Sequence, residues 1–212
     1  MPNVKNNSAS QDTRRRLLQA AGEIFAERGF HAATIKEITD RAGASLASVN
    51  YHFQDKSELY AAVLRQIGER IIERIPPDDQ LIGTPEMRFR QFIQWYCLRA
   101  CDYTQTPWLP ILIAREIAEP TEAFDWLLQN YTRPLIDKLS ALIAELIGAP
   151  ITDESVGLIT ASVFGQCTYF LKHVRLLSRV HPQLGEHPDL QRLATHIADF
   201  SLAALNSIQT AR

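Results

Sequence analysis

The sequence predicts an all-α protein of about nine helices, divided into a small N-terminal group and a larger C-terminal bundle. Apolar residues recur at helical spacing along almost the whole chain, and sustained alternation with a period of two is missing. Leu, Ala, Ile, Glu, Gln and Arg dominate the composition, and most of these are strong helix formers. The run Pro76-Pro77-Asp78-Asp79 cannot continue a helix, so we expect a linker there.

Four short helices are predicted before this linker. The first runs from about Thr13 to Arg28 and stops at Gly29, a residue type that commonly ends helices. The second begins at Thr34-Ile35-Lys36-Glu37, where Thr and Glu have the spacing of a capping box. The third spans Ser45 to Phe53. The fourth begins at Asp55-Lys56-Ser57-Glu58, a second capped start, and continues towards the linker.

Longer helices are predicted after the linker, with boundaries set by prolines and by Gly148. We therefore expect a first domain of residues 1–55, a connecting helix of residues 56–75 and a second domain of residues 76–212. The helices expected in the second domain are Pro85–Asp102, Trp108–Glu119, Thr121–Asn130, Pro134–Ile147, Thr152–Ser178 and Asp189–Ser207.

Charge and composition narrow the function classes. The net charge of −2 argues against a protein that coats nucleic acid indiscriminately, which would need a strongly basic surface. Residues 1–74 carry 11 Lys and Arg against 9 Asp and Glu, a small excess in the direction expected for a DNA-binding domain. The opening residues lack the apolar core of a signal peptide, and three irregularly spaced cysteines do not make a disulfide framework. We expect a cytoplasmic protein.

The segment from Thr34 to Lys56 carries the most informative pattern. Two helices of about eight residues are joined by a tight turn at Gly43, and a third capped helix follows. This is the geometry of a helix-turn-helix motif, in which the second helix of the pair enters the major groove of DNA. That helix is Ser45–Phe53 here, so the N-terminal domain is predicted to bind double-stranded DNA.

The side chains around this helix suit contact with DNA. Small residues at its start allow close approach to base edges, and hydroxyl, phenol and imidazole groups bond to phosphates or bases. Lys56 lies in the first turn of the next helix, where its charge and free backbone amides form an anion site. Arg14-Arg15-Arg16 either touches the DNA backbone or forms a solvated helix face. The candidate DNA-binding residues are Thr34, Ser45, Leu46, Ala47, Ser48, Asn50, Tyr51, His52 and Lys56.

Two stretches, Ala20–Ile38 and Ala42–Tyr60, resemble the DNA-binding domain of TetR-family regulators. Asn50-Tyr51-His52-Phe53-Gln54-Asp55-Lys56 and Ile24-Phe25-Ala26-Glu27-Arg28-Gly29-Phe30 carry the likeness. Asn50 stands where many members have Tyr, and Leu46 stands where Lys is frequent. The resemblance therefore does not imply which bases this protein reads. Arg115–Asp125 and Gly165-Gln166-Cys167 resemble the C-terminal domain of CecR-like members, which are linked to sensitivity to antibiotics and other toxic compounds.

The resemblance implies a homodimer formed by the last two helices and a pocket in each C-terminal domain whose ligand releases the DNA. We therefore expect a homodimeric repressor that binds a palindromic operator, with two recognition helices about 34–36 Å apart in successive major grooves. The expected effector is a small apolar or amphipathic molecule. The residues expected to line the dimer interface are Leu158, Val163, Leu171, Leu193, Ile197, Phe200 and Ala204.

Aromatic residues concentrated in the C-terminal domain suit an apolar pocket with a few polar groups. Plain core packing is the alternative for each of them, and Glu116 either serves the pocket or pairs with Arg115 or Arg133. The candidate ligand-binding residues are Trp95, Tyr96, Arg99, Trp108, Glu116, Phe124, Gln166, Tyr169, Phe170 and His173.

An enzyme or a helical small-molecule carrier is the alternative reading, in which the N-terminal domain does not bind DNA. Cys167 and His173 are six residues apart on a helix, which puts them on different faces, and no glycine-rich phosphate loop or nucleophile elbow is present. Cys97 and Cys101 share a helix face but have no nearby His to complete a metal site. We expect no catalytic residues, no metal and no cofactor.

Overall fold

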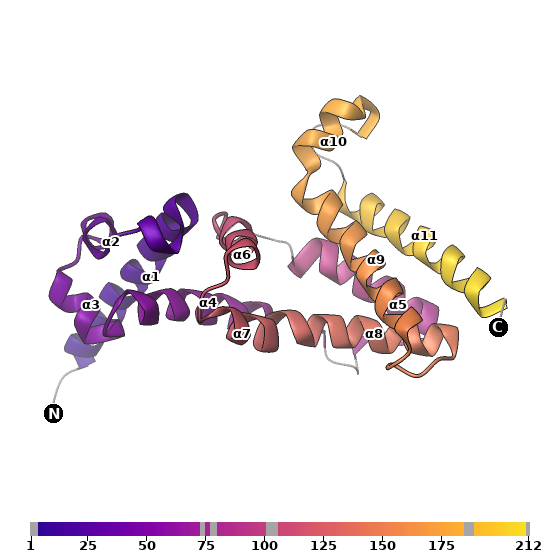
Figure 1. The fold of residues 1–212 in the computed structure, drawn as a ribbon, viewed down its shortest axis with the longest axis horizontal. Helices are drawn as coiled ribbons and strands as arrows, with labels where there is room; N and C mark the ends of the chain where they lie inside the picture. The colour runs from indigo at the N-terminus through magenta and orange to yellow at the C-terminus, as the bar shows by residue number, and fades with distance from the viewer. Residues whose placement is uncertain (1–3, 73–74, 77–79, 101–105, 185–188, 211–212) are drawn as a thin grey trace. The chain divides into compact units, whose positions relative to one another are not determined.

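The computed structural model describes residues 4–72, 75–76, 80–100, 106–184 and 189–210. Almost all of these residues are helical and none lies in a strand, which confirms the predicted all-α class (Figure 1). Within these ranges, no helix has both the length and the apolar character needed to cross a membrane. The chain forms two compact units, Met1–Arg70 with Tyr103–Tyr131 and Ile71–Asp102 with Thr132–Arg212.

Unit 1 contains the three predicted N-terminal helices and most of the fourth. Its core includes the fully buried Phe25, Ile38, Val49 and Leu59, which come from four different helices. The helices of this unit are α1 (Val4–Ala32), α2 (Ile35–Ala42), α3 (Leu46–Phe53), α4 (Lys56–Ile72), α6 (Leu109–Ala118), α7 (Phe124–Leu127) and the π-helix η3 (Leu128–Thr132).

Helix α1 begins at Val4, well before the predicted start near Thr13. Residues 4–12 are mostly polar and form no apolar stripe, so periodicity gives no sign of this extension. The Thr13 hydroxyl donates to the Ala9 carbonyl at 3.0 Å, and Arg15 forms an ion pair with Asp12 at 2.7 Å. Near its other end the helix kinks at Gly29, whose φ of 79° is in the left-handed region that favours glycine.

The segment that contains α6 and α7 packs with the N-terminal helices, whereas we expected all of residues 76–212 to form the second domain. The compact units of the structure therefore do not follow the expected boundaries. Long-range packing of α6 against α1 decides this, and such packing leaves no local signal in the sequence.

Unit 2 is a helical bundle in which α5 packs against both α8 and α11, and α9 packs against α8 and α11. The predicted helix Thr152–Ser178 is broken at His173, which has non-helical dihedral angles, so that α10 forms an arm beyond the end of α9 (Figure 1). The elements of this unit are α5 (Pro85–Trp95), the π-helix η2 (Tyr96–Ala100), α8 (Arg133–Ile147), α9 (Glu154–Lys172), α10 (Val174–Val180), the 3-10 helix η4 (Pro182–Leu184) and α11 (Leu190–Thr210).

Candidate nucleic-acid interface

Local hydrogen bonds fix the turn between α2 and α3. The backbone N–H of Glu37 donates to the Thr34 hydroxyl oxygen at 3.3 Å, and the backbone N–H of Thr34 donates to the Glu37 carboxylate at 3.1 Å. This is the capping box that the sequence predicts. Gly43 ends α2 with a φ of 58°, and Arg16 donates to the Ala42 and Gly43 carbonyls at 2.6 and 3.1 Å. The cation of Arg16 therefore stabilises the carbonyl end of α2.

Helix α3 is anchored on one face and open on the other. Val49 and Phe53 are buried, and the guanidinium of Arg14 lies 5.3 Å from the centre of the Phe53 ring. Tyr51 and Leu46 are 79% and 59% exposed, and Ala47 and Asn50 are also exposed. Because these four residues share the open face, the structure brings most of the predicted DNA-binding residues of α3 together on one surface.

Ser45 and Ser48 have a shared structural role at the start of α3. The Ser45 hydroxyl oxygen accepts the Ser48 backbone N–H at 3.2 Å, and the two hydroxyl oxygens are 2.9 Å apart. Ser45 is therefore the N-cap of α3. The Ser48 hydroxyl belongs to the same polar cluster at the exposed end of the helix.

An open hollow of about 650 Å³ lies between the beginning of α1 and α3. Its lining is rich in hydroxyl groups, and hydroxyls both donate to phosphate oxygens and bond to base edges. Ser10 and Thr13 of α1 are part of this lining and were missed in the sequence, because the extension of α1 has no apolar periodicity. The lining residues are Ala9, Ser10, Thr13, Ser45, Ala47, Ser48, Tyr51 and His52.

His52 faces this hollow with a partly buried ring beside Tyr51. Burial lowers the pKa of His52 from its ordinary value, and the nearby charge of Arg14 lowers this pKa further. At neutral pH the imidazole is therefore held in its uncharged form, in which one nitrogen donates a hydrogen bond and the other accepts one.

Lys56 has a structural role in addition to its predicted role in an anion site. Its ammonium group donates to the His31 and Ala33 carbonyls at 3.2 and 3.0 Å and lies 4.7 Å from the centre of the Phe30 ring. It thereby fastens the first turn of α4 to the end of α1. A substitution of Lys56 consequently removes a fold contact together with a charge.

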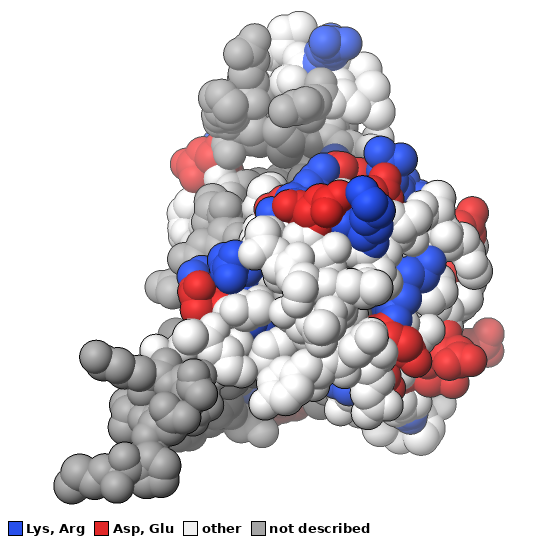
Figure 2. Space-filling view, turned by 90° about the vertical axis from the view of Figure 1, so that its left-hand side faces the viewer, with Lys and Arg blue, Asp and Glu red and all other residues white. Residues whose placement is uncertain are grey.

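Several cations of the head, by which we mean helices α1 to α4, lie in ion pairs, so the face of the head that carries α3 is not uniformly basic. Arg41 pairs with Glu27 at 2.7 Å, Arg28 with Glu37 at 3.2 Å, and the exposed Lys36 with Asp40 at 3.1 Å. Figure 2, which views the molecule from the left-hand side of Figure 1, shows basic and acidic groups interspersed around uncharged residues. Neutral donors must therefore supply a large share of any phosphate contacts on this face.

Glu116 is a buried structural carboxylate of unit 1. It is 1% exposed and accepts hydrogen bonds from the Tyr60 hydroxyl at 2.5 Å, the Thr121 backbone N–H at 2.9 Å and the Thr121 hydroxyl at 2.8 Å. Burial raises the pKa of the Tyr60 phenol, and its hydrogen bond to Glu116 raises it further. Within unit 1, Glu116 forms no ion pair with Arg115, one of the two partners that the sequence suggested; Arg133, the other, belongs to unit 2.

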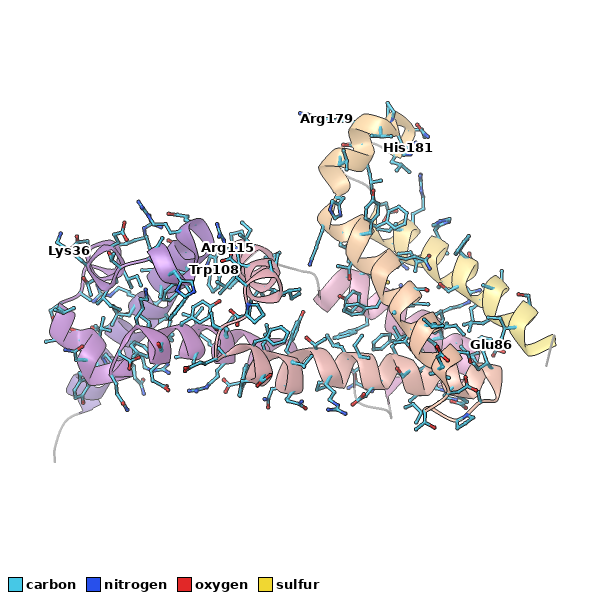
Figure 3. The ribbon with its side chains drawn as sticks, in the orientation of Figure 1. Lys36, Glu86, Trp108, Arg115, Arg179 and His181 are labelled. Atoms are coloured by element: carbon cyan, nitrogen blue, oxygen red, sulfur yellow. The ribbon has the colours of Figure 1, made fainter. Side chains whose placement is uncertain are left out.

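Two other side chains of the α6 segment fix it to α1. Arg115 donates from Nε to the Ala26 carbonyl at 3.0 Å and from Nη2 to the Glu27 carbonyl at 3.2 Å. Trp108 is 8% exposed and lies against α1, where Gly22 leaves room for the indole. Both side chains extend from the α6 segment in Figure 3. Together with Glu116, they connect α6 to α1 and α4, two helices of the head.

The predicted ligand-binding residues do not form one group within either unit. Trp108, Glu116 and Phe124 belong to unit 1, whereas the others belong to unit 2. In unit 2, the rings of Tyr169 and His173 stack with their centres 4.7 Å apart, and Tyr96 packs on Phe164 at 5.2 Å. The side chain of Arg99 lies outside the described residues. The remaining candidates of unit 2 are Trp95, Gln166 and Phe170.

The predicted dimer residues divide by burial. Val163 is 2% exposed and Ile197 is 0% exposed, so both belong to the core of their own chain, which corrects our expectation for these two. Leu158 and Phe200 are 64% and 61% exposed, and Ala204 is also exposed. Leu171 and Leu193 are half-buried. The exposed members lie on outer faces of α9 and α11.

The cysteines form a different pair from the one suggested by spacing. Cys97 and Cys167 are buried free thiols that hydrogen-bond to each other, and this contact lowers the pKa of Cys97 while burial opposes it. Cys101 lies outside the described residues. Among the residues that the structure describes, no cluster of three or more His, Cys, Asp or Glu side chains has the arrangement of a metal site.

Two family profiles match the chain. Residues 17–63 match the profile described as "Bacterial regulatory proteins, tetR family". Residues 85–205, more than half of the chain, match the profile described as "HTH-type transcriptional dual regulator CecR, C-terminal domain". The matches contain the motifs that carry the resemblance seen in the sequence, and they confirm it.

Similar proteins are regulators of the same kind. The dual regulator CecR of Shigella flexneri is 29% identical over 181 residues, which cover 80% of each chain. The activator FasR of Mycolicibacterium smegmatis is 43% identical over 74 residues, or 34% of each chain. The structure of a TetR-like regulator from Rhodococcus sp. RHA1 superposes with a TM-score of 0.68 at 19% identity, covering 97% of this chain and 98% of that one, which shows a shared fold.

Proposed function

The chain belongs to the TetR family of bacterial regulatory proteins, and from this premise we propose that it is a homodimeric repressor released from a palindromic operator by a small molecule. As a member of this family it is a DNA-binding transcriptional regulator. The observation that carries the proposal is the open face of α3, where Leu46, Asn50 and Tyr51 are exposed above a buried anchor of Val49 and Phe53. A helix held in this way presents side chains to base edges without losing its fixed position.

Tyr51 provides the sharpest test of the proposed contact between α3 and operator DNA. Its 79% exposed phenol donates to no described residue, so the hydroxyl is available to a phosphate oxygen. We expect Tyr51→Phe to weaken operator binding by about 1–3 kcal/mol, the usual worth of a charge-assisted hydrogen bond. Ile151→Ala, at an exposed residue of unit 2 that lies outside the proposed dimer helices, is the control. Equal affinities of Tyr51→Phe and wild type, measured by fluorescence anisotropy, would refute the docking.

The proposed dimer uses the exposed faces of α9 and α11. Gly157 and Gly165 have open space at their Cα atoms, and with Leu158 and Tyr169 they form a stripe of small and apolar residues on α9. Phe200 is an exposed apolar residue of α11. Two copies of such a helix pair form a four-helix interface across a two-fold axis.

Sedimentation velocity at micromolar concentration tests this interface. We expect wild type to sediment as a dimer and Phe200→Asp to sediment as a monomer, because a carboxylate buried in the interface has no partner. Ile151→Asp changes an apolar residue of similar exposure that lies outside both helices, and it should leave the dimer intact. A monomeric wild type would contradict the proposal.

Repression and ligand release are the functional parts of the proposal. A repressor whose operator overlaps a promoter lowers transcription, so deleting the gene should raise expression of the target and restoring it should lower expression again. An activator would give the opposite change. A small-molecule carrier or enzyme, the alternative class, would show turnover or tight ligand binding without sequence-dependent DNA binding.

A further inference from the structure

Unit 2 contains a cavity of about 550 Å³ where the end of α9, the α10 arm, η4 and the beginning of α11 meet. Phe170, Leu177 and Leu193 supply apolar surface from three different helices. A volume of this size is in the range of small-molecule sites, which are mostly apolar and have a few oriented polar groups. None of the residues that we expected to bind ligand, apart from Phe170, lines this cavity.

The polar groups of the cavity favour a negative ligand. Arg192, His181 and His196 line it, and the guanidinium of Arg192 forms no ion pair with any described residue. His181 lies at the end of the α10 arm, as Figure 3 shows. An arginine that pairs with no described acidic residue and lies beside an apolar wall is suited to bind a carboxylate or sulfonate.

Asp189 is the one acidic residue of the described lining, and its carboxylate accepts hydrogen bonds from the backbone. Its Oδ1 atom accepts the backbone N–H groups of Gln191 at 2.8 Å and Arg192 at 3.4 Å, at the start of α11. It thereby caps a helix of 21 residues, whose N-terminal end carries partial positive charge. Asp189 thus satisfies backbone donors of the helix, and the guanidinium of Arg192 remains available to a bound anion.

We propose that this cavity binds an amphipathic anion, with its apolar part against Phe170, Leu177 and Leu193 and its acidic group at Arg192. The proposal gives a chemical class to the effector and, for its regulatory consequence, rests on the proposed function. Because residues of α9 and α11 line the cavity, a bound ligand would contact the two helices that form the proposed dimer interface.

Calorimetric titration of the full chain with sodium decanoate tests the site without any DNA. Decan-1-ol has the same chain length without the charge and serves as the matched probe. We expect one decanoate per chain, and we expect decan-1-ol to bind at least about tenfold more weakly, since a charge-assisted hydrogen bond is absent. Decanoate binding no tighter than decan-1-ol, or many molecules per chain, would overturn the proposal.

Variants locate the binding. Arg192→Ala should weaken decanoate about tenfold and leave decan-1-ol unchanged, whereas Arg133→Ala, which removes an exposed arginine of α8, should change neither. Leu177→Trp should block both probes by filling the cavity, with helical content and melting temperature showing that the variant is folded. Unchanged decanoate binding in both Arg192→Ala and Leu177→Trp would refute the site.

Operator binding separates this inference from the proposed function. If decanoate binds and also releases operator DNA, the cavity is an effector site. Binding without release would keep the cavity as an anion site and refute its regulatory role. If Arg192→Ala changed the dimer dissociation constant but not decanoate binding, the cavity would be a contact surface for the second copy, and the ligand proposal would fail.

Discussion

Replacing Gly22 with Ala tests how α6 is fastened to the DNA-binding head. A Cβ atom at this position would overlap Cη2 and Cζ2 of the Trp108 indole and lie 2.7 Å from its Cε2. The indole is rigid and 8% exposed, so it must move as a whole to relieve these contacts. Overpacking of this kind costs about 1–3 kcal/mol, and overlap with three ring atoms places the cost near the upper limit.

The same substitution has an opposing effect on the helix. Ala is favoured over Gly inside a helix by about 1 kcal/mol, so the expected net loss of stability is about 2 kcal/mol. For a cooperative chain of this size, such a loss lowers the melting temperature by about 4–8 °C. Urea unfolding followed by circular dichroism measures the free energy directly.

A double-mutant cycle with Trp108→Phe isolates the contact. The shorter phenyl ring does not reach the new methyl group, so Gly22→Ala should cost less in the Trp108→Phe background, with a coupling of about 1 kcal/mol or more. Gly22→Ala at an uncrowded helical site would instead stabilise the wild-type background by about 1 kcal/mol. That result would contradict the close contact between the Trp108 indole and α1.

Two further substitutions test the polar contacts of unit 1. Tyr60→Phe removes the hydroxyl that donates to the buried Glu116 carboxylate. The variant should lower the free energy of unfolding in urea by about 1–3 kcal/mol. A loss below roughly 0.5 kcal/mol, the size expected for a surface substitution, would argue against the buried hydrogen bond. Thr34→Ala removes the N-cap of α2 and should cost about 1 kcal/mol at pH 7. Hydrogen bonds from Thr34 lower the pKa of Glu37 below its ordinary 4.5, so this carboxylate stabilises the fold above pH 4.5 and loses its contribution as the pH falls through the lowered pKa. The stability difference between wild type and Thr34→Ala should therefore shrink in acid, and a constant difference down to pH 2 would contradict the capping role of Glu37.

The DNA-binding head could be predicted from the sequence because its signals are local. The Thr34 capping box and the tight turn at Gly43 are each encoded within a few residues, and the structure has both of them. The fastening of Lys56 to the end of α1 joins positions more than 20 residues apart, and no local pattern encodes it.

The faces of α9 and α11 show a different limit of sequence reasoning. Both helices have apolar residues on more than one face, so periodicity does not distinguish the core side from an interface side. Val163 and Phe200 were therefore assigned to the same surface, although one lies in the core and the other is exposed. The placement of Trp108 and Glu116 beside the head has the same origin, since it follows from tertiary packing of α6.

Selection from a pool of random DNA duplexes by the full-length protein, followed by footprinting of the enriched site, tests the central claim most directly. We expect a palindromic sequence with half-sites about one or two helical turns apart, occupied by two chains and bound much less tightly by Tyr51→Phe. Enrichment of no common sequence, or of a site without two-fold symmetry bound by one chain, would contradict the account of a dimeric operator-binding regulator.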